Sequence, residues 1–167
     1  RRDLMSAVNG GMRRISFGLE TGSQELLDRM QKGSSVERNA QFIHDAHAAG
    51  LSIRCTMFKG FPGETAMDME ATERFLEKHG HMLDRVRFNN FSLYTDTPVW
   101  RDMVGTAESG AELALTTSDH ARAQFGYRRL RPFGRDYRRS KARVLSIVHQ
   151  INRRPLRDSA RQFDGLM

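Results

Sequence analysis

Two glycine-containing segments, residues 18–23 and 60–65, hold residue types that could form a ligand-binding site. The first reads GLETGS and the second GFPGET. In the second, Gly60 and Gly63 permit backbone angles with positive φ, and Pro62 fixes the chain between them. Each segment lies between a strand-like run and a helix-like pattern. Such a junction exposes backbone N–H groups at the positive end of a helix dipole, and it therefore predicts a ligand site.

Three strand-like runs, residues 13–19, 51–58 and 85–91, must position these segments. Helical patterns separate the runs. One begins with a capping-box sequence at residues 34–37, and the next covers residues 66–79 before a glycine. This alternation is typical of βα repeats with parallel strands, and it predicts an α/β fold.

Each predicted strand alternates between an apolar face and a polar or charged face. In the second strand Ile53, Cys55 and Met57 share one face, whereas Arg54 and Thr56 lie on the other. A sheet covered on both faces would have nearly continuous apolar strands. The pattern favours the wall of a barrel whose working face is at the carboxyl ends of its strands. A half-exposed sheet with a wet face is the alternative.

The composition limits the class of protein. The 167 residues suffice for one domain with a core, or for part of a larger one. No apolar run approaches the roughly 20 residues that span a membrane. The single cysteine, Cys55, excludes an intrachain disulfide and a cysteine-rich metal site, and it predicts a cytoplasmic location. The chain opens with Arg1 rather than Met and shows no signal peptide, which indicates a fragment of a longer protein.

The net charge of +7 is unevenly distributed, because residues 128–161 hold twelve Arg or Lys and only two acidic residues. Helices are predicted over residues 119–125 and, more strongly, over residues 137–152. Aromatic residues are interleaved with the cations, namely Tyr127, Phe133 and Tyr137. This segment could contact RNA phosphates and stack on bases. A solvated accessory helix, or a surface facing another domain, is the favoured interpretation.

Four segments, in this order, resemble the second half of the radical SAM core domain. They are residues 14–23 (RISFGLETGS), 27–33 (LDRMQKG), 60–65 (GFPGET) and 88–98 (FNNFSLYTDTP). The branch often fused to cobalamin-binding domains is most similar, and the methylthiotransferases come next. The resemblance implies half of a partial (β/α)6 TIM-like barrel. Residues 1–105 would supply three βα units with parallel strands, and residues 106–167 a basic helical extension.

The resemblance also implies a chemistry. In this superfamily a [4Fe-4S] cluster reduces S-adenosylmethionine (SAM) to a 5′-deoxyadenosyl radical, and this radical abstracts a hydrogen atom. In some members SAM also serves as a methyl donor. Cobalamin is a further cofactor of the most similar branch. Three cysteines in a Cys-x3-Cys-x2-Cys loop hold the cluster, and this chain lacks that loop; Cys55 cannot replace it. We therefore expect no metal ligand in this chain. We also expect that the chain requires the missing N-terminal half of the barrel as a partner.

The same resemblance implies roles for residues near the strand ends. The expected cofactor-binding residues are Glu20, Ser23, Arg54, Phe58, Gly60, Phe91, Ser92 and Leu93. Glu20 would accept from the SAM ammonium or a ribose hydroxyl, and Arg54 would pair with its carboxylate. The alternatives are a Glu20–Arg54 salt bridge, a helix cap at Ser23 and an ordinary tight turn at residues 60–65. Arg87 and Asn89 could contact substrate or make hydrogen bonds within the barrel wall.

The sequence thus predicts a fragment of a radical SAM enzyme, inactive alone, whose substrate is a small molecule rather than RNA. A fragment of a tRNA-modifying methylthiotransferase is the first alternative, and a non-catalytic half-barrel that binds a partner is the second. A TIM-barrel enzyme that acts on a phosphate-containing substrate is a weaker alternative, because no phosphate-binding loop flanked by Lys or Arg follows the third strand. His44 and His47 are three residues apart but have no evident third metal ligand.

Overall fold

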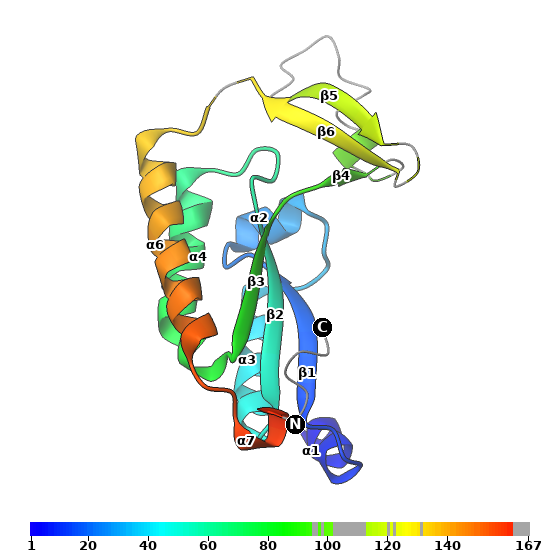
Figure 1. Ribbon diagram of the computed structural model, residues 1–167, viewed down its shortest axis with the longest axis vertical. Helices are drawn as coiled ribbons and strands as arrows, with labels where there is room; N and C mark the ends of the chain where they lie inside the picture. The colour runs from blue at the N-terminus through cyan, green and yellow to red at the C-terminus, as the bar shows by residue number, and fades with distance from the viewer. Residues whose placement is uncertain are drawn as a thin grey trace.

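A three-stranded parallel sheet in the order β1-β2-β3 forms the centre of the molecule (Figure 1). The computed structural model describes residues 1–94, 97, 99–101, 113–119, 121, 123–130 and 132–161. The strands are β1 (Arg14–Glu20), β2 (Ser52–Lys59) and β3 (Arg85–Asn90). They agree with the three predicted runs to within about one residue, so the α/β fold with parallel strands is confirmed.

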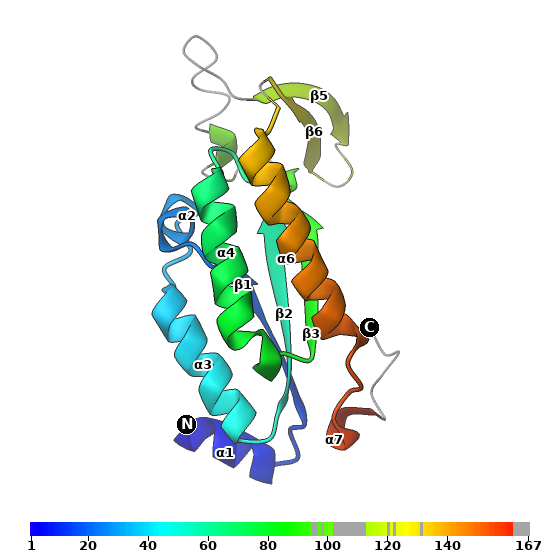
Figure 2. The same ribbon diagram turned by 90° about the vertical axis from the view of Figure 1, so that its left-hand side faces the viewer.

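Helices α3, α4 and α6 lie over one face of this sheet, as Figure 2 shows. The helices are α1 (Arg2–Asn9), α2 (Gln24–Arg29), α3 (Val36–Ala48), α4 (Ala66–His79), the 3-10 turn η1 (Gly80–Met82), α6 (Arg135–Arg153) and α7 (Asp158–Arg161). Ser35 caps α3. Thr65 and Asp68 form a reciprocal capping box at the start of α4, because each side chain accepts from the backbone N–H of the other.

The core lies between the sheet and these helices. Ile53, Cys55 and Met57 are at most 2% exposed, whereas Arg54 and Thr56 on the opposite face are only partly covered. The predicted alternation is therefore confirmed, and it follows from the period of two along a strand. In the described part of the chain no helix is long and apolar enough to span a membrane.

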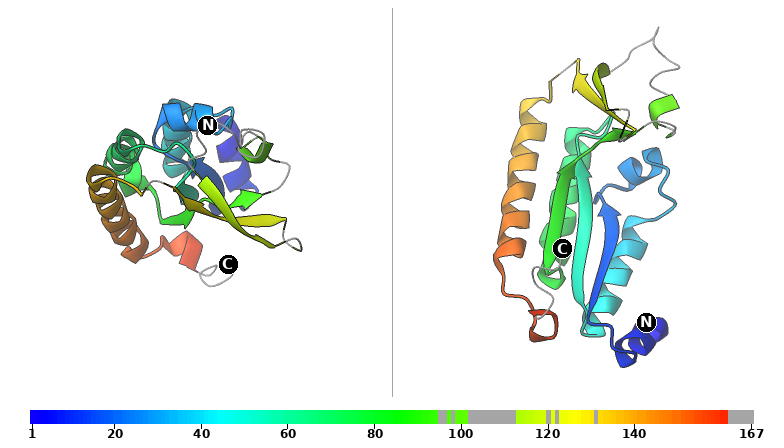
Figure 3. Two further views of the ribbon diagram at one scale, coloured as in Figure 1. Left: turned by 90° about the horizontal axis from the view of Figure 1, so that it is seen from above. Right: turned by 45° about the vertical axis from the view of Figure 1, so that its right-hand side comes forward.

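A second, antiparallel sheet lies beyond the carboxyl end of β3 (Figure 3). It consists of β4 (Leu93–Tyr94), β5 (Leu113–Asp119) and β6 (Gln124–Arg129), in the order β4-β6-β5. The predicted helix over residues 119–125 is wrong, and the extension is not purely helical. Its aromatic residues Phe125 and Tyr127 recur with a period of two and pair across strands. The predicted boundary at residue 105 lies outside the described residues.

The two edges of the parallel sheet differ. On the outer side of β3, the Asn152 side chain accepts from the Val86 N–H (2.8 Å) and donates to the Val86 carbonyl (2.9 Å). Lys59 donates to the Phe88 carbonyl at 2.8 Å. Side chains therefore occupy backbone groups that a further strand would need. β1 has no strand on its other side among the described residues, so this sheet is open at β1.

Candidate functional site

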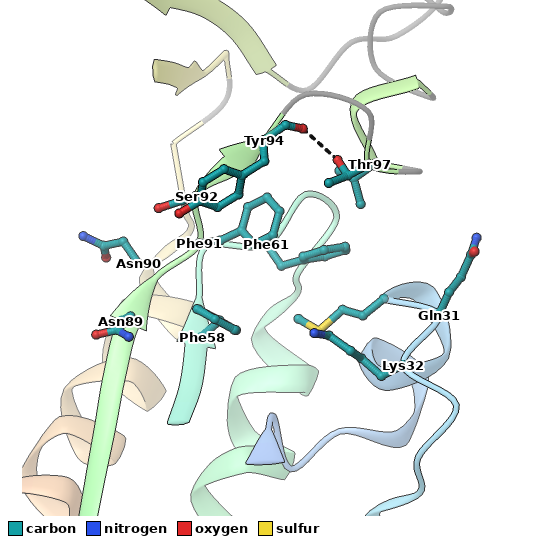
Figure 4. A pocket seen from close by; sticks show the side chains of 12 residues that line it. Gln31, Lys32, Phe58, Phe61, Asn89, Asn90, Phe91, Ser92, Tyr94 and Thr97 are labelled. Carbon is teal, nitrogen blue, oxygen red and sulfur yellow. Dashed lines mark hydrogen bonds between the residues drawn. The ribbon is translucent and has the colours of Figure 1, made fainter. Parts of the chain in front are cut away.

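A cavity of about 690 Å³, here called the strand-end cavity, lies at the carboxyl ends of β2 and β3. Its walls come from the loop after α2, the end of β2, the segment 60–65 and the chain from β3 into β4, as Figure 4 shows. This is the edge at which parallel α/β sheets place their ligands, and the volume suits a molecule of cofactor size.

Aromatic rings form one wall of the strand-end cavity. Phe58, Phe61 and Phe91 line it, and the rings of Phe61 and Phe91 meet edge to face with centroids 4.8 Å apart. Figure 4 shows these rings converging from the end of β2, the glycine segment and the chain after β3. Such a wall can hold a planar ring by stacking and by removing it from water.

A carboxylate lies beside this cavity. Glu20 ends β1 with a φ of 65°, and its Oε1 is 3.2 Å from the ammonium of Lys32, which lines the cavity. The Oε2 atom of Glu20 is buried and accepts no hydrogen bond in the described part of the chain. A Cβ on Gly18 would lie 2.5 Å from Oε1, so the glycine makes room for this carboxylate. A buried acceptor without a donor is costly.

A polar network joins the two glycine segments. Ser23 Oγ caps α2 by accepting from the Leu26 N–H, and it donates to Asp68 at 2.6 Å. Arg29 donates to Asp68 and to the Gly63 carbonyl. Burial alone would raise the pKa of Asp68, but the donors that surround it hold that pKa below its ordinary value. Asp68 therefore acts as a charged hub for both loops.

Gly22 allows the first loop to pack directly on α4. Its N–H donates to Thr72 Oγ1 at 3.0 Å, and Thr21 exchanges a 2.9 Å hydrogen bond with the same hydroxyl. A Cβ at Gly22 would lie 2.6 Å from the Phe75 Cβ and 2.7 Å from the Thr72 Cα. The absence of a side chain is thus a packing requirement at this position.

Helix α6 holds the second loop. Tyr137 donates to Glu64 Oε2 at 2.8 Å, and the Gly60 N–H donates to the same atom at 2.5 Å. Glu64 is 4% exposed, and its burial raises the pKa of the carboxyl. The positive φ of Gly60 brings its N–H into this arrangement. The C-terminal helix therefore fixes the shape of the loop at the cavity.

The structure brings together about half of the residues expected at the site. Phe58, Asn89, Phe91 and Ser92 line the strand-end cavity. Glu20 does not line the cavity, but it forms an ion pair with Lys32, which does. Four sequence-based candidates thus line one space, and a fifth contacts one of its lining residues.

The remaining candidates lie elsewhere. Ser23 is 5% exposed and is engaged with Leu26 and Asp68, which is the helix-cap alternative. Leu93 is fully buried in β4. Arg54 and Arg87 lie on the uncovered face of the sheet without lining the strand-end cavity. Gly60 borders a neighbouring pocket instead.

Sequence reasoning missed several lining residues. Lys32 and Gln31 belong to a segment that carried the resemblance, but their side chains received no role. The positive φ of Gln31 (54°) turns this loop toward the cavity. Phe61 lay inside the recognised glycine segment, and Tyr94 lay in the segment after β3. The motifs that contain these residues were recognised in the sequence. Which of their side chains point into the cavity depends on how the loops fold.

The donor set of the described residues does not fit a metal cluster. No group of three or more His, Cys, Asp or Glu that could hold a metal occurs there. Cys55 is buried, and burial raises the pKa of its thiol to about 12. His44 meets the His79 ring edge-on, 5.5 Å between centroids. A [4Fe-4S] cluster would therefore need ligands from other residues.

Comparison with known families agrees with this arrangement. Residues 2–76 match the model of the radical SAM superfamily. This segment is similar to that superfamily over somewhat less than half of the chain. The resemblance seen in the sequence is thereby confirmed at the superfamily level, and the radical SAM segment holds β1, β2 and most of α4. The similarity to the cobalamin-associated branch stays a prediction.

Three relatives illustrate the range of similar proteins. An uncharacterised methyltransferase of Pyrococcus horikoshii is 30% identical over 91 residues, 54% of this chain and 19% of its own length. A ribosomal protein uS12 methylthiotransferase of Flavobacterium psychrophilum is 33% identical over 66 residues, 38% of this chain and 15% of its own. A tRNA-2-methylthio-N(6)-dimethylallyladenosine synthase of Moorella thermoacetica is 28% identical over 86 residues, which make up 50% of this chain and 18% of that protein. The chain thus spans less than a fifth of these relatives.

Proposed function

We propose that this chain is the carboxyl-terminal, SAM-binding half of the catalytic barrel of a radical SAM enzyme. The observation that carries the proposal is the strand-end cavity, where the lining residue Lys32 pairs with Glu20, a carboxylate whose buried Oε2 has no hydrogen-bond partner in the described part of the chain. A ribose hydroxyl or the ammonium of SAM would supply the missing donor. When bound at a reduced cluster, SAM supplies a radical or a methyl group.

The lining residues suggest how SAM would be oriented. Phe58, Phe61 and Phe91 would enclose the adenine, and Lys32 would face the SAM carboxylate. Asn89, which lines the cavity, would face the substrate. Arg87 is the other residue expected to contact substrate. Ser23, Arg54, Gly60 and Leu93 would then act on the site through the loops and strands rather than from the cavity wall.

The cluster and the rest of the barrel would come from an N-terminal half. Its last strand would pair with the open edge of β1, which is the free position in the parallel sheet. Cobalamin, if used, would also be held outside these residues. We propose a small molecule as substrate, because the cavity is of cofactor size and closed on one side by aromatic rings.

A methylthiotransferase is the second candidate, and the relatives with that name favour it. The basic segment would then approach a macromolecule through phosphate or acidic groups rather than by stacking on bases. Tyr137 is 2% exposed, its ring stacks on Phe133 at 3.6 Å, and Tyr127 donates to the Phe91 carbonyl. Tyr137 is therefore engaged inside the protein, whereas Tyr127 and Phe133 are only partly buried.

Calorimetric titration of the full-length protein with SAM tests the first proposal. Glu20→Gln keeps the size of the side chain but removes the charge, and we expect about tenfold weaker SAM binding. Glu25→Gln, on the exposed side of α2, is the matched control and should bind as the wild type does. Equal SAM affinity in Glu20→Gln and wild type would remove Glu20 from the site.

A further inference from the structure

A second pocket, here called the hairpin pocket, lies between the end of β2, residues 90–92 and β6, with a volume of about 390 Å³. Residues 90–92 also line the strand-end cavity, so the two spaces share one wall. Figure 1 shows β6 crossing above the ends of β2 and β3. The described residues that line the hairpin pocket include two cations and no acidic side chain.

Lys59 is the first cation. Its Nζ donates to the Phe88 carbonyl at 2.8 Å and lies 4.8 Å from the centre of the Phe88 ring. An ammonium has three N–H donors, so others remain for a ligand. Burial and the nearby charge of Lys141 lower the pKa of Lys59. The charge of Lys141 thus disfavours the charged form of Lys59, whereas the charge of Glu64 favours it.

Arg129 is the second cation, and its position is fixed. The guanidinium lies 4.0 Å from the centre of the Phe133 ring, and Nη1 donates to the Phe61 carbonyl at 3.4 Å. Phe133 in turn stacks on Tyr137. A cation held in this way loses little conformational freedom when it binds a ligand.

The acidic residue beside this cluster is a poor counterion. Glu64 does not line the pocket, and its Oε2 already accepts from Tyr137 and from the N–H of Gly60, a lining residue. Burial raises the pKa of the Glu64 carboxyl, although the charge of Arg129 acts in the opposite direction. Among the described residues that line the hairpin pocket, the cationic side chains therefore outnumber the acidic ones.

We propose that the hairpin pocket binds the phosphate group of a small phosphate ester, held by Lys59 and Arg129 within the added positive potential of Lys141. A phosphate dianion matches several cations better than a single carboxylate does, and a guanidinium can bind it with two N–H groups. Asn90, Ser92 and Gln124 supply neutral polar groups around the rim. The volume exceeds that of phosphate alone and admits a sugar-sized group.

The test is calorimetric titration of the full-length protein with ribose 5-phosphate, with ribose and inorganic phosphate as comparison probes. Lys59→Gln keeps a donor for the Phe88 carbonyl, and it should weaken ribose 5-phosphate binding about tenfold. Lys141→Gln should weaken it by a few-fold, through charge alone. Arg138→Gln, an exposed position on α6, removes one charge away from the pocket and should leave the affinity unchanged.

Titration of each sample with SAM separates this proposal from the proposed function and confirms that the variant is folded. Absence of ribose 5-phosphate binding in a protein that binds SAM would overturn the hairpin site alone. An equal loss in Lys59→Gln and Arg138→Gln would assign the binding to general surface charge and would also overturn it. If inorganic phosphate bound as tightly as ribose 5-phosphate, the ester assignment would be wrong. Ribose 5-phosphate binding without SAM binding would support the pocket and contradict the proposed function.

Discussion

Tyr137 donates a 2.8 Å hydrogen bond to Glu64, and this contact joins residues 73 positions apart. Glu64 belongs to the glycine segment beside the strand-end cavity, whereas Tyr137 lies in the first turns of α6. Both side chains are at most 4% exposed. The loop at the candidate site is therefore held by a helix from the basic segment, and the chemistry of this buried carboxyl should influence the stability of the whole fold.

Glu64 should make stability fall as the pH rises. Because burial raises its folded pKa above the ordinary value of 4.5, the folded state keeps the proton longer than the unfolded state does. The contribution is fully present below about pH 4.5 and is lost as the pH rises through the raised pKa, with a slope of at most about 1.4 kcal/mol per pH unit. Glu64→Gln should lack this component. Urea unfolding of both proteins between pH 4 and 8 measures it, and identical pH profiles would contradict the assignment.

Asn152→Ala should destabilise the fold by about 1–2 kcal/mol, because the buried N–H and carbonyl of Val86 would lose both hydrogen bonds. Gln150→Ala is the matched control: it lies on the same helix and is also exposed. Urea unfolding at pH 7 compares the two. A free energy of unfolding that is equal in both variants would show that water replaces the Asn152 amide without cost.

Gly22→Ala should destabilise by about 1–3 kcal/mol or more, because the new Cβ would overlap backbone and Cβ atoms of α4 that cannot rotate away. Gly10→Ala provides the comparison. Its φ is −76°, and a Cβ there would meet nothing closer than 3.4 Å. Thermal unfolding should therefore show a lower midpoint for Gly22→Ala alone. A midpoint equal to that of Gly10→Ala would mean that the first loop can move off α4.

Cys55 should resist alkylation in the native protein. With a pKa of about 12, its thiolate fraction at pH 8 is on the order of 10⁻⁴, and the side chain is only 2% exposed. Iodoacetamide should modify it after addition of urea but not before, as mass spectrometry can follow. Stoichiometric labelling of the native protein within minutes would place this strand in frequent local unfolding.

The parallel sheet was predictable because its signals are local. The alternation of Ile53, Cys55 and Met57 is contained in one strand, and the capping box of α4 spans only residues 65–68. The aromatic and polar residues near the strand ends also followed from short motifs. Each of these features depends on neighbours within one element, so a single sequence is sufficient to predict them.

The parts that were missed depend on pairs of distant residues. Strands β5 and β6 stabilise each other, and residues 119–125 alone carried a helix-like composition. The ion pair between Glu20 and Lys32 depends on the turn that brings Lys32 back toward the end of β1, and no local pattern indicates that turn. The cations at positions 59, 129 and 141 share no motif, and only the folded chain brings their charges together.

The unequal edges of the parallel sheet also limit how copies of the chain can aggregate. Continuous growth of a β-fibre needs a free backbone edge on both sides of every unit. Here the side chain of Asn152 blocks one side, so two copies that met through β1 would have no further edge of this sheet to offer. Misassembly along this sheet would therefore stop at a pair, and polymers would have to use another surface.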